Sequence, residues 1–128
     1  MEKEIIINQD LHFEHKQWLS EIAFWEDELK TFKKRLGELV ICRSEGGMLI
    51  QLEHFQNQFI LHGGVIEDLK EIIEKHETRI AGQNLMGQDA LDTAMVKEHL
   101  KFRDKIETQR QIYADLKKEF FHFLTNSL

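Results

Sequence analysis

Three of the seven histidines in this chain stand where large apolar residues are expected, and they are the side chains best suited to chemistry. His15, His76 and His99 each interrupt a run in which Leu, Ile, Met, Phe or Trp recurs every three or four residues. A neutral imidazole offers a nitrogen lone pair to zinc, iron or copper. Three imidazoles that met inside the protein would supply three of the four ligands of zinc, at about 2.0–2.1 Å, and would leave one position open.

Further polar side chains stand close to these histidines in the sequence. Glu14, Glu77 and Glu98 are their immediate neighbours, and His12 lies one helical turn before His15. A carboxylate that accepts a hydrogen bond from a ligating imidazole fixes the orientation of the ring and strengthens its bond to the metal. Each of these four side chains could therefore orient an imidazole or complete the coordination of a metal ion.

Two other arrangements of the three histidines are open. A hydrogen-bonded cluster without metal could fix the register of the helices, as buried polar residues do in coiled coils. Alternatively, one or two of the imidazoles could rotate out of the core. Because a lone buried histidine is usually structural, the metal hypothesis depends on all three lying together.

The elements that must position these residues are three long amphipathic helices. Apolar residues recur in alternating steps of four and three over residues 9–43, 48–81 and 89–124, and this period predicts helices that each bury one stripe. The chain has no proline and only seven glycines among 128 residues. We therefore predict one all-α domain over residues 1–128, a long antiparallel up-down-up three-helix bundle of coiled-coil type that could dimerise. The predicted heptad positions are Leu11, His15, Trp18, Ile22, Trp25, Leu29, Phe32, Leu36, Leu39, then Met48, Leu52, Phe55, Phe59, His62, Ile66, Leu69, Ile73, His76, Ile80, then Met95, His99, Phe102, Ile106, Gln109, Tyr113, Leu116, Phe120, Phe123.

Local signals predict where these helices begin and end. Asn8 or Asp10 can cap the first helix and Asp89 the third, because short polar side chains accept hydrogen bonds from free backbone N–H groups. Residues 44–47, which end in two glycines, favour a turn after the first helix. The second helix is expected to end near Gly82.

Gly63 and Gly64 stand in the middle of the second helical segment. Each costs about 1 kcal/mol relative to alanine within a helix, so the pair could divide this helix in two. The heptad phase is the same before and after the pair. We therefore predict a continuous helix.

Antiparallel helices pair residues whose numbers add to a constant. The apolar positions align at a sum of 91 for the first two helices and 175 for the second and third, which pairs Phe32 with Phe59, for example. The same registers bring His15, His76 and His99 into one layer, with one histidine from each helix. The sequence thus predicts a polar layer across the bundle.

A second group of polar and aromatic residues lies further along the predicted core. By the same registers, His62 would hydrogen-bond to Tyr113, and the indole N–H of Trp25 would contact Gln109. Such bonds would satisfy these buried groups. The functional alternative is a small ligand pocket that the glycine pair opens and that these four residues line.

Charge and motifs exclude several classes of function. The chain carries 23 acidic and 17 basic side chains of interspersed sign, for a net charge of −6, which disfavours nucleic acid and anionic membranes as partners. The N-terminal residues resemble neither a signal peptide nor a membrane span, and Cys42 is the single cysteine, so we expect a cytoplasmic protein. No nucleotide-binding loop or nucleophile elbow is present. One Glu-x-x-His pair, Glu119 with His122, is too few for a ferritin-like di-iron site.

The sequence favours a small non-enzymatic protein that acts as an interaction or structural module, and it identifies no catalytic residue. Apolar residues off the heptad positions favour a protein partner or a homo-oligomer; they are Phe13, Phe24, Ile50, Ile60, Leu61, Leu100 and Phe121. The alternative is a mononuclear metal-binding protein that holds one zinc or iron ion on the three histidines, for sensing, storage or hydrolysis. Hydrolysis is the weakest of these, because apolar layers would flank the metal and restrict access to it.

Overall fold

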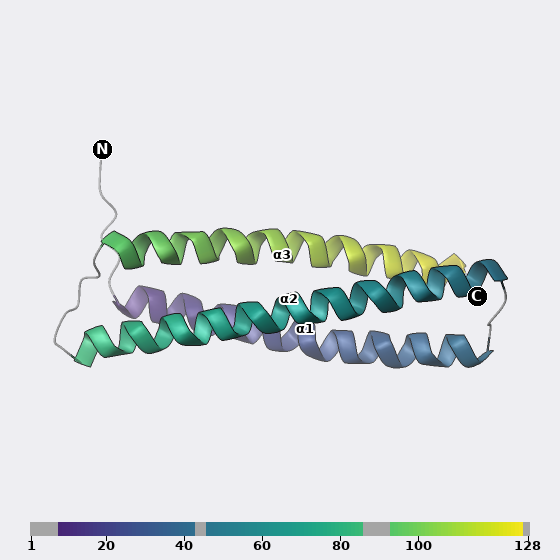
Figure 1. Cartoon of the computed structure of the whole chain (residues 1–128), viewed down its shortest axis with the longest axis horizontal. Coiled ribbons are helices and arrows are strands. Elements are labelled where there is room, and N and C mark those ends of the chain that lie inside the picture. The colour runs from purple at the N-terminus through teal and green to yellow at the C-terminus, as the bar shows by residue number, and fades with distance from the viewer. Residues whose placement is uncertain (1–7, 43–45, 86–92, 127–128) are drawn as a thin grey trace.

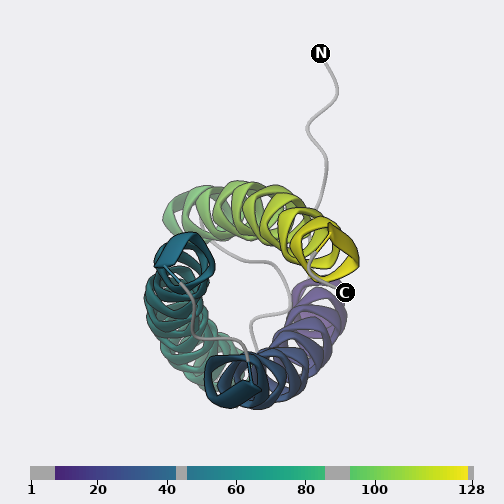
Figure 2. The ribbon, with the colours of Figure 1, turned by 90° about the vertical axis from the view of Figure 1, so that its right-hand side faces the viewer.

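The chain folds into three long α-helices that run side by side (Figure 1). The computed structural model describes residues 8–42, 46–85 and 93–126, all of which are helical. Helix α1 spans Asn8–Cys42, α2 spans Gly46–Leu85 and α3 spans Thr93–Asn126. Viewed end-on, the helices surround a common axis (Figure 2), and successive helices run in opposite directions. The predicted all-α three-helix bundle is confirmed.

The helix ends differ by a few residues from those predicted. Helix α2 continues past Gly82 to Leu85, and Gly46 and Gly47 begin this helix instead of standing in a turn. A glycine costs a helix only about 1 kcal/mol, which the packing of neighbouring apolar residues outweighs. The predicted turn at Ser44 and cap at Asp89 lie outside the described residues.

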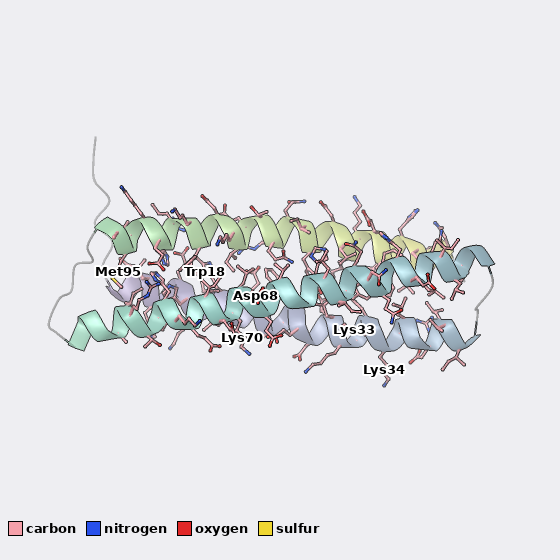
Figure 3. All side chains as sticks on the ribbon, viewed as in Figure 1. Trp18, Lys33, Lys34, Asp68, Lys70 and Met95 are labelled. Atoms are coloured by element: carbon pink, nitrogen blue, oxygen red, sulfur yellow. The ribbon has the colours of Figure 1, made fainter. Side chains whose placement is uncertain are left out.

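Helix α2 is continuous through Gly63 and Gly64, as predicted. A Cβ atom added at Gly64 would meet no heavy atom within 4 Å, and one at Gly63 would lie 3.9 Å from the Nζ atom of Lys33. Lys33 belongs to α1 and is labelled in Figure 3. Both positions could therefore hold a side chain, and the helices do not need glycine here in order to approach.

The core consists of the predicted heptad positions. Every one of them is buried except Met48, which is partly buried. Aromatic rings fill the half of the bundle that is remote from His15, His76 and His99. There the Phe32 and Phe59 rings lie 5.9 Å apart and the Phe55 and Phe120 rings 5.3 Å apart, in the registers predicted for α1 with α2 and for α2 with α3. Burial of these apolar side chains is what holds the three helices together.

The three histidines divide the apolar core into two parts. Figure 3 shows Met95 and Trp18, which belong to the two parts, near one end of the bundle. The smaller part is a cluster of three residues, Leu11, Ile80 and Met95. The larger part fills the rest of the bundle, and its nearest predicted layer is Trp18, Ile73 and Phe102. The predicted polar layer thus forms a boundary inside the core.

The outer faces of the helices are mainly polar but carry scattered large apolar side chains. All seven off-heptad apolar residues named above are exposed, from Leu100 at 40% to Ile50 at 71%. None of the described helices combines the length and apolarity that crossing a membrane requires. The apolar side chains on the surface are therefore candidates for contacts with other proteins.

Replacing Gly64 by alanine is expected to stabilise the protein by about 1 kcal/mol, because the site is helical and has room for a methyl group. Chemical denaturation followed by circular dichroism would measure the change. Gly37→Ala, five residues before the end of α1 and equally open, is the control and should also give a gain. A loss of stability in Gly64→Ala alone would show that α2 needs glycine at this point.

Candidate metal centre

His15, His76 and His99 come from three different helices and meet inside the bundle. They are buried, with at most 1% of each residue exposed. Their ring centroids lie 4.9 Å apart for His15 and His76, 5.0 Å for His15 and His99, and 5.6 Å for His76 and His99. We call these three residues the histidine layer. One nitrogen from each ring lies within 4.8 Å of the other two, so the predicted layer exists and no ring turns out to solvent.

The nitrogens that face one another can be identified from their contacts. His15 Nε2 lies 3.2 Å from His99 Nδ1. His76 Nε2 is buried, and it has no hydrogen-bond partner among residues 8–42, 46–85 and 93–126. Two ligands of a tetrahedral zinc ion lie about 3.3 Å apart, so the first pair already has the spacing of metal ligands. The nitrogen of His76 would need to approach the pair by at most about 1.4 Å to complete the set.

The outward nitrogens of the histidine layer are supported by glutamates. His15 Nδ1 bonds to Glu77, which also bonds to His12 through its other carboxylate oxygen. His99 Nε2 bonds to Glu14. We call Glu14, Glu77 and Glu98 the layer glutamates, and each supports a histidine on another helix. The contacts form a cycle, because the glutamate of α1 faces the histidine of α3, the glutamate of α3 faces that of α2, and the glutamate of α2 faces that of α1.

The third glutamate of the cycle is less tightly placed. An oxygen of Glu98 lies 3.9 Å from His76 Nδ1. Arg79 pairs with Glu98, and its guanidinium lies 3.5 Å from the same Nδ1, to which it donates. A metal ion on Nε2 of His76 requires the ring proton to sit on Nδ1. Arg79 would then turn fully to Glu98, which is the nearest acceptor for that proton.

Arg79 and Arg103 are parts of the site that the sequence did not reveal. Arg103 holds Glu14 with two hydrogen bonds, of 3.0 Å from Nε and 2.8 Å from the terminal nitrogen. The two arginines follow His76 and His99 by three and four residues, so the signal was their position one turn after a core histidine. Their charges compensate the carboxylates that enter the edge of the core.

The electrostatic environment keeps the carboxyl groups charged. Burial acts to raise the pKa of Glu14, but hydrogen bonds from Arg103 and His99 outweigh it and leave the pKa below its usual value. Glu77 shows the same balance, with its pKa lowered by the hydrogen bonds from His15 and His12. The anionic form that accepts hydrogen bonds from the imidazoles is therefore favoured.

Burial also favours neutral imidazoles in the histidine layer. It lowers the pKa of His76 to about 4, helped by repulsion from His15. Burial likewise lowers the pKa of His99, although Glu14 acts in the opposite direction. Apolar rings surround the two, since Trp18 stacks on His99 at 4.8 Å and Phe102 meets His76 edge-on at 5.0 Å. A neutral imidazole is the form that binds a metal ion.

The second polar group is connected differently from the prediction. Gln109 lies 3.4 Å from His62 Nδ1, and the Tyr113 hydroxyl donates to Glu28 at 2.9 Å. The Tyr113 hydroxyl thus bonds to Glu28 instead of His62, and His62 meets Gln109, which lies one turn before Tyr113 in α3. The contact of the Trp25 indole N–H with Gln109 stays a prediction. Burial lowers the pKa of His62, and burial together with Glu28 raises that of Tyr113. Trp25, His62, Gln109 and Tyr113 are all buried, and a ligand pocket there stays a prediction.

Comparison with known proteins adds no family assignment. No family model, no curated protein and no solved structure matches this chain. Among the described residues, the histidine layer is the one group of three His, Cys, Asp or Glu side chains whose ligand atoms lie close enough to share a metal ion. The case for a site therefore rests on the geometry of that layer.

In metal-free protein, we expect stability to fall as the pH drops from 6.5 towards 4. The unfolded imidazole of His76 titrates near 6.5 and the folded one near 4, so the unfolded chain binds more protons in this window. Stability is full above pH 6.5, and the loss from His76 alone is of order 3 kcal/mol. Melting curves in chelator at several pH values would measure it.

The matched variant for this pH series is His76→Leu, which places an apolar side chain at this core position and removes the titrating imidazole. Its stability should vary less than that of the native chain between pH 7 and 5. Glu14 and Glu77, whose pKa values are lowered, contribute losses only below about pH 4.5, outside this range. A native melting temperature that is unchanged between pH 7 and 5 would contradict buried neutral histidines.

Proposed function

We propose that this protein binds one divalent transition-metal ion, zinc or iron, on the three nitrogens of the histidine layer. The observation that carries the proposal is the 3.2 Å separation of His15 Nε2 and His99 Nδ1. Glu77 and Glu14 can only accept hydrogen bonds, so each takes the N–H of its histidine. In the neutral rings, His15 Nε2 and His99 Nδ1 then each carry a lone pair and no proton. Two lone pairs face each other favourably only when a cation lies between or beside them.

A proton is the competing occupant of this position. It would make one ring an imidazolium that donates to the other, with both outer nitrogens still bonded to carboxylates. The buried surroundings oppose a charged ring, and burial lowers the pKa of His99. The Nε2 atom of His76 would also remain without a partner. A metal ion would use all three nitrogens, which favours the metal over the proton.

Storage or sensing of the ion fits the surroundings better than hydrolysis does. Apolar residues pack on both sides of the histidine layer, with Leu11 and Ile80 on one side and Trp18 and Phe102 on the other. A substrate would have to enter between these layers to reach the open position on the metal. We therefore propose a non-catalytic role. A cytoplasmic location is part of this proposal and is supported by the single cysteine in the chain.

Elemental analysis of untagged protein purified without chelator tests the proposal. We expect close to one zinc or iron ion per chain, and we expect EDTA to lower the melting temperature. At a free metal concentration about a thousandfold above Kd, the bound ion would add about 4 kcal/mol to the free energy of unfolding. Native protein that is metal-free and whose melting temperature does not respond to added zinc would refute the metal function.

Two variants distinguish the histidine layer from adventitious binding. His76→Leu should fold, because the position is buried and packs against the Phe102 ring, but it should lose the metal and the response to EDTA. His54→Ala removes an exposed histidine of α2 and should retain both. Retention of stoichiometric metal by His76→Leu would place the ion elsewhere.

A second candidate function is self-association or binding of another protein through exposed aromatic residues. Phe24 of α1 is 56% exposed and Phe121 of α3 is 45% exposed. The Nζ atom of Lys117 lies 5.5 Å from the first ring and 6.0 Å from the second, so both rings belong to one surface patch. Aromatic side chains are enriched at protein interfaces. A homodimer through this patch is the simplest form of the proposal.

Light scattering across a range of concentrations tests the homodimer. The native chain should approach twice its 15.3 kDa mass, and Phe24→Ser combined with Phe121→Ser should stay monomeric because the patch loses its apolar area. Ile50→Ser, at an exposed site near the start of α2, is the control and should behave as the native chain does. A native chain that remains monomeric at the highest concentration would exclude the dimer.

A further inference from the structure

The three contacts that surround the histidine layer are not equivalent. Between α1 and α3, Arg103 covers Glu14. Between α2 and α3, Arg79 covers Glu98. Between α1 and α2, the outer partner of the glutamate is a histidine, His12. On two sides of the histidine layer the outer group is thus an arginine, which is always charged. On the α1–α2 side it is a histidine, a type of side chain that can bind metal ions.

The third side also forms a graded path from solvent to the core. The side chain of His12 is 52% exposed, that of Glu77 is 26% exposed and that of His15 is 1% exposed. Glu77 bonds to His12 through one carboxylate oxygen and to His15 through the other. Within the described residues, Glu77 pairs with histidines alone. Nitrogen and oxygen ligands therefore follow one another from the surface to the histidine layer.

Electrostatics makes the three sides different for an incoming cation. A guanidinium stays charged at every physiological pH and repels a divalent ion. Glu77 contacts an imidazole nitrogen through each of its two oxygens, and an ionised carboxylate can accept both of these hydrogen bonds. His12 donates a hydrogen bond from Nδ1 to Glu77, so the other ring nitrogen carries the lone pair that can bind a metal ion. A metal ion would therefore be attracted to the α1–α2 side more than to the other two sides, where an arginine neutralises the carboxylate.

We propose that His12 and Glu77 form the entry site through which the metal ion reaches the histidine layer. This inference rests on the proposed metal-binding function. His12 would hold the hydrated ion first, through the nitrogen that does not bond to Glu77. The Glu77 carboxylate would take the ion next, as its bond to His12 breaks, and the ion would then pass to Nε2 of His15. His12 thus controls the rate at which the site fills and empties. It is not one of the three final ligands.

Stopped-flow mixing of the metal-free protein with Co²⁺, followed by the visible absorption of the bound ion, tests this proposal. His12→Ala should lower the association rate about tenfold, within the range that local charge and ligands impose on association. The Kd should stay within about threefold of the native value, so the dissociation rate should fall in the same proportion. His12→Arg places an arginine beside Glu77, as on the other two sides, and should lower the association rate further. His122→Ala, an exposed histidine at the far end of α3, is the control and should bind at the native rate.

The outcomes separate this inference from the function on which it rests. Tight binding at an unchanged rate in both His12 variants would overturn the entry site and leave the metal function standing. Weaker binding at an unchanged association rate would also overturn it, because His12 would then be a ligand of the final complex. If the native chain takes up no metal, the proposed function fails and the entry site fails with it. Melting curves of both variants establish that they fold.

Discussion

A buried imidazole has two ring nitrogens that need partners, and this requirement shapes the whole of one end of the molecule. The three histidines lie between apolar layers of the core, where an unpaired polar atom costs about 1–3 kcal/mol. Five of the six ring nitrogens have contacts in the structure, and Nε2 of His76 has none. The layer glutamates, held by their arginines, lie beside the histidines and supply hydrogen-bond partners for the ring nitrogens. The unpartnered nitrogen is the point at which the protein alone does not satisfy the layer.

The cycle of glutamates also explains how a simple bundle holds one register. Glu14 is next to His15 in the sequence but bonds to His99 on another helix, and Glu77 is next to His76 but bonds to His15. Sliding one helix by a heptad would keep apolar residues in contact with apolar residues. It would also leave charged carboxylates and buried imidazoles without partners. Polar contacts between helices therefore specify an alignment that the apolar stripe alone would leave less well defined.

The sequence predicted the core and the histidine layer well, because both depend on the heptad phase. The phase survives Gly63 and Gly64, so a continuous α2 followed from it, and the aromatic pairs of the distant half took the predicted registers. Hydrogen bonds could not be predicted in the same way. His62 reaches Gln109 because small axial shifts decide between residues one turn apart. The long side chain of Arg103 could have reached several carboxylates, and a periodicity does not distinguish among them.

The position of the histidine layer near one end of the bundle gives its occupancy a structural consequence. Beyond the layer, the apolar core formed by the described residues consists of Leu11, Ile80 and Met95, one residue from each helix. Burial of three such side chains contributes only a few kcal/mol against the backbone entropy of the last turns. The cohesion of this end therefore depends strongly on the layer itself. An ion bound to all three helices would join them at the boundary, whereas a layer with an unpaired nitrogen would hold them less firmly. A bundle built in this way can convert the presence of a metal ion into order at one end, which is what a sensor requires.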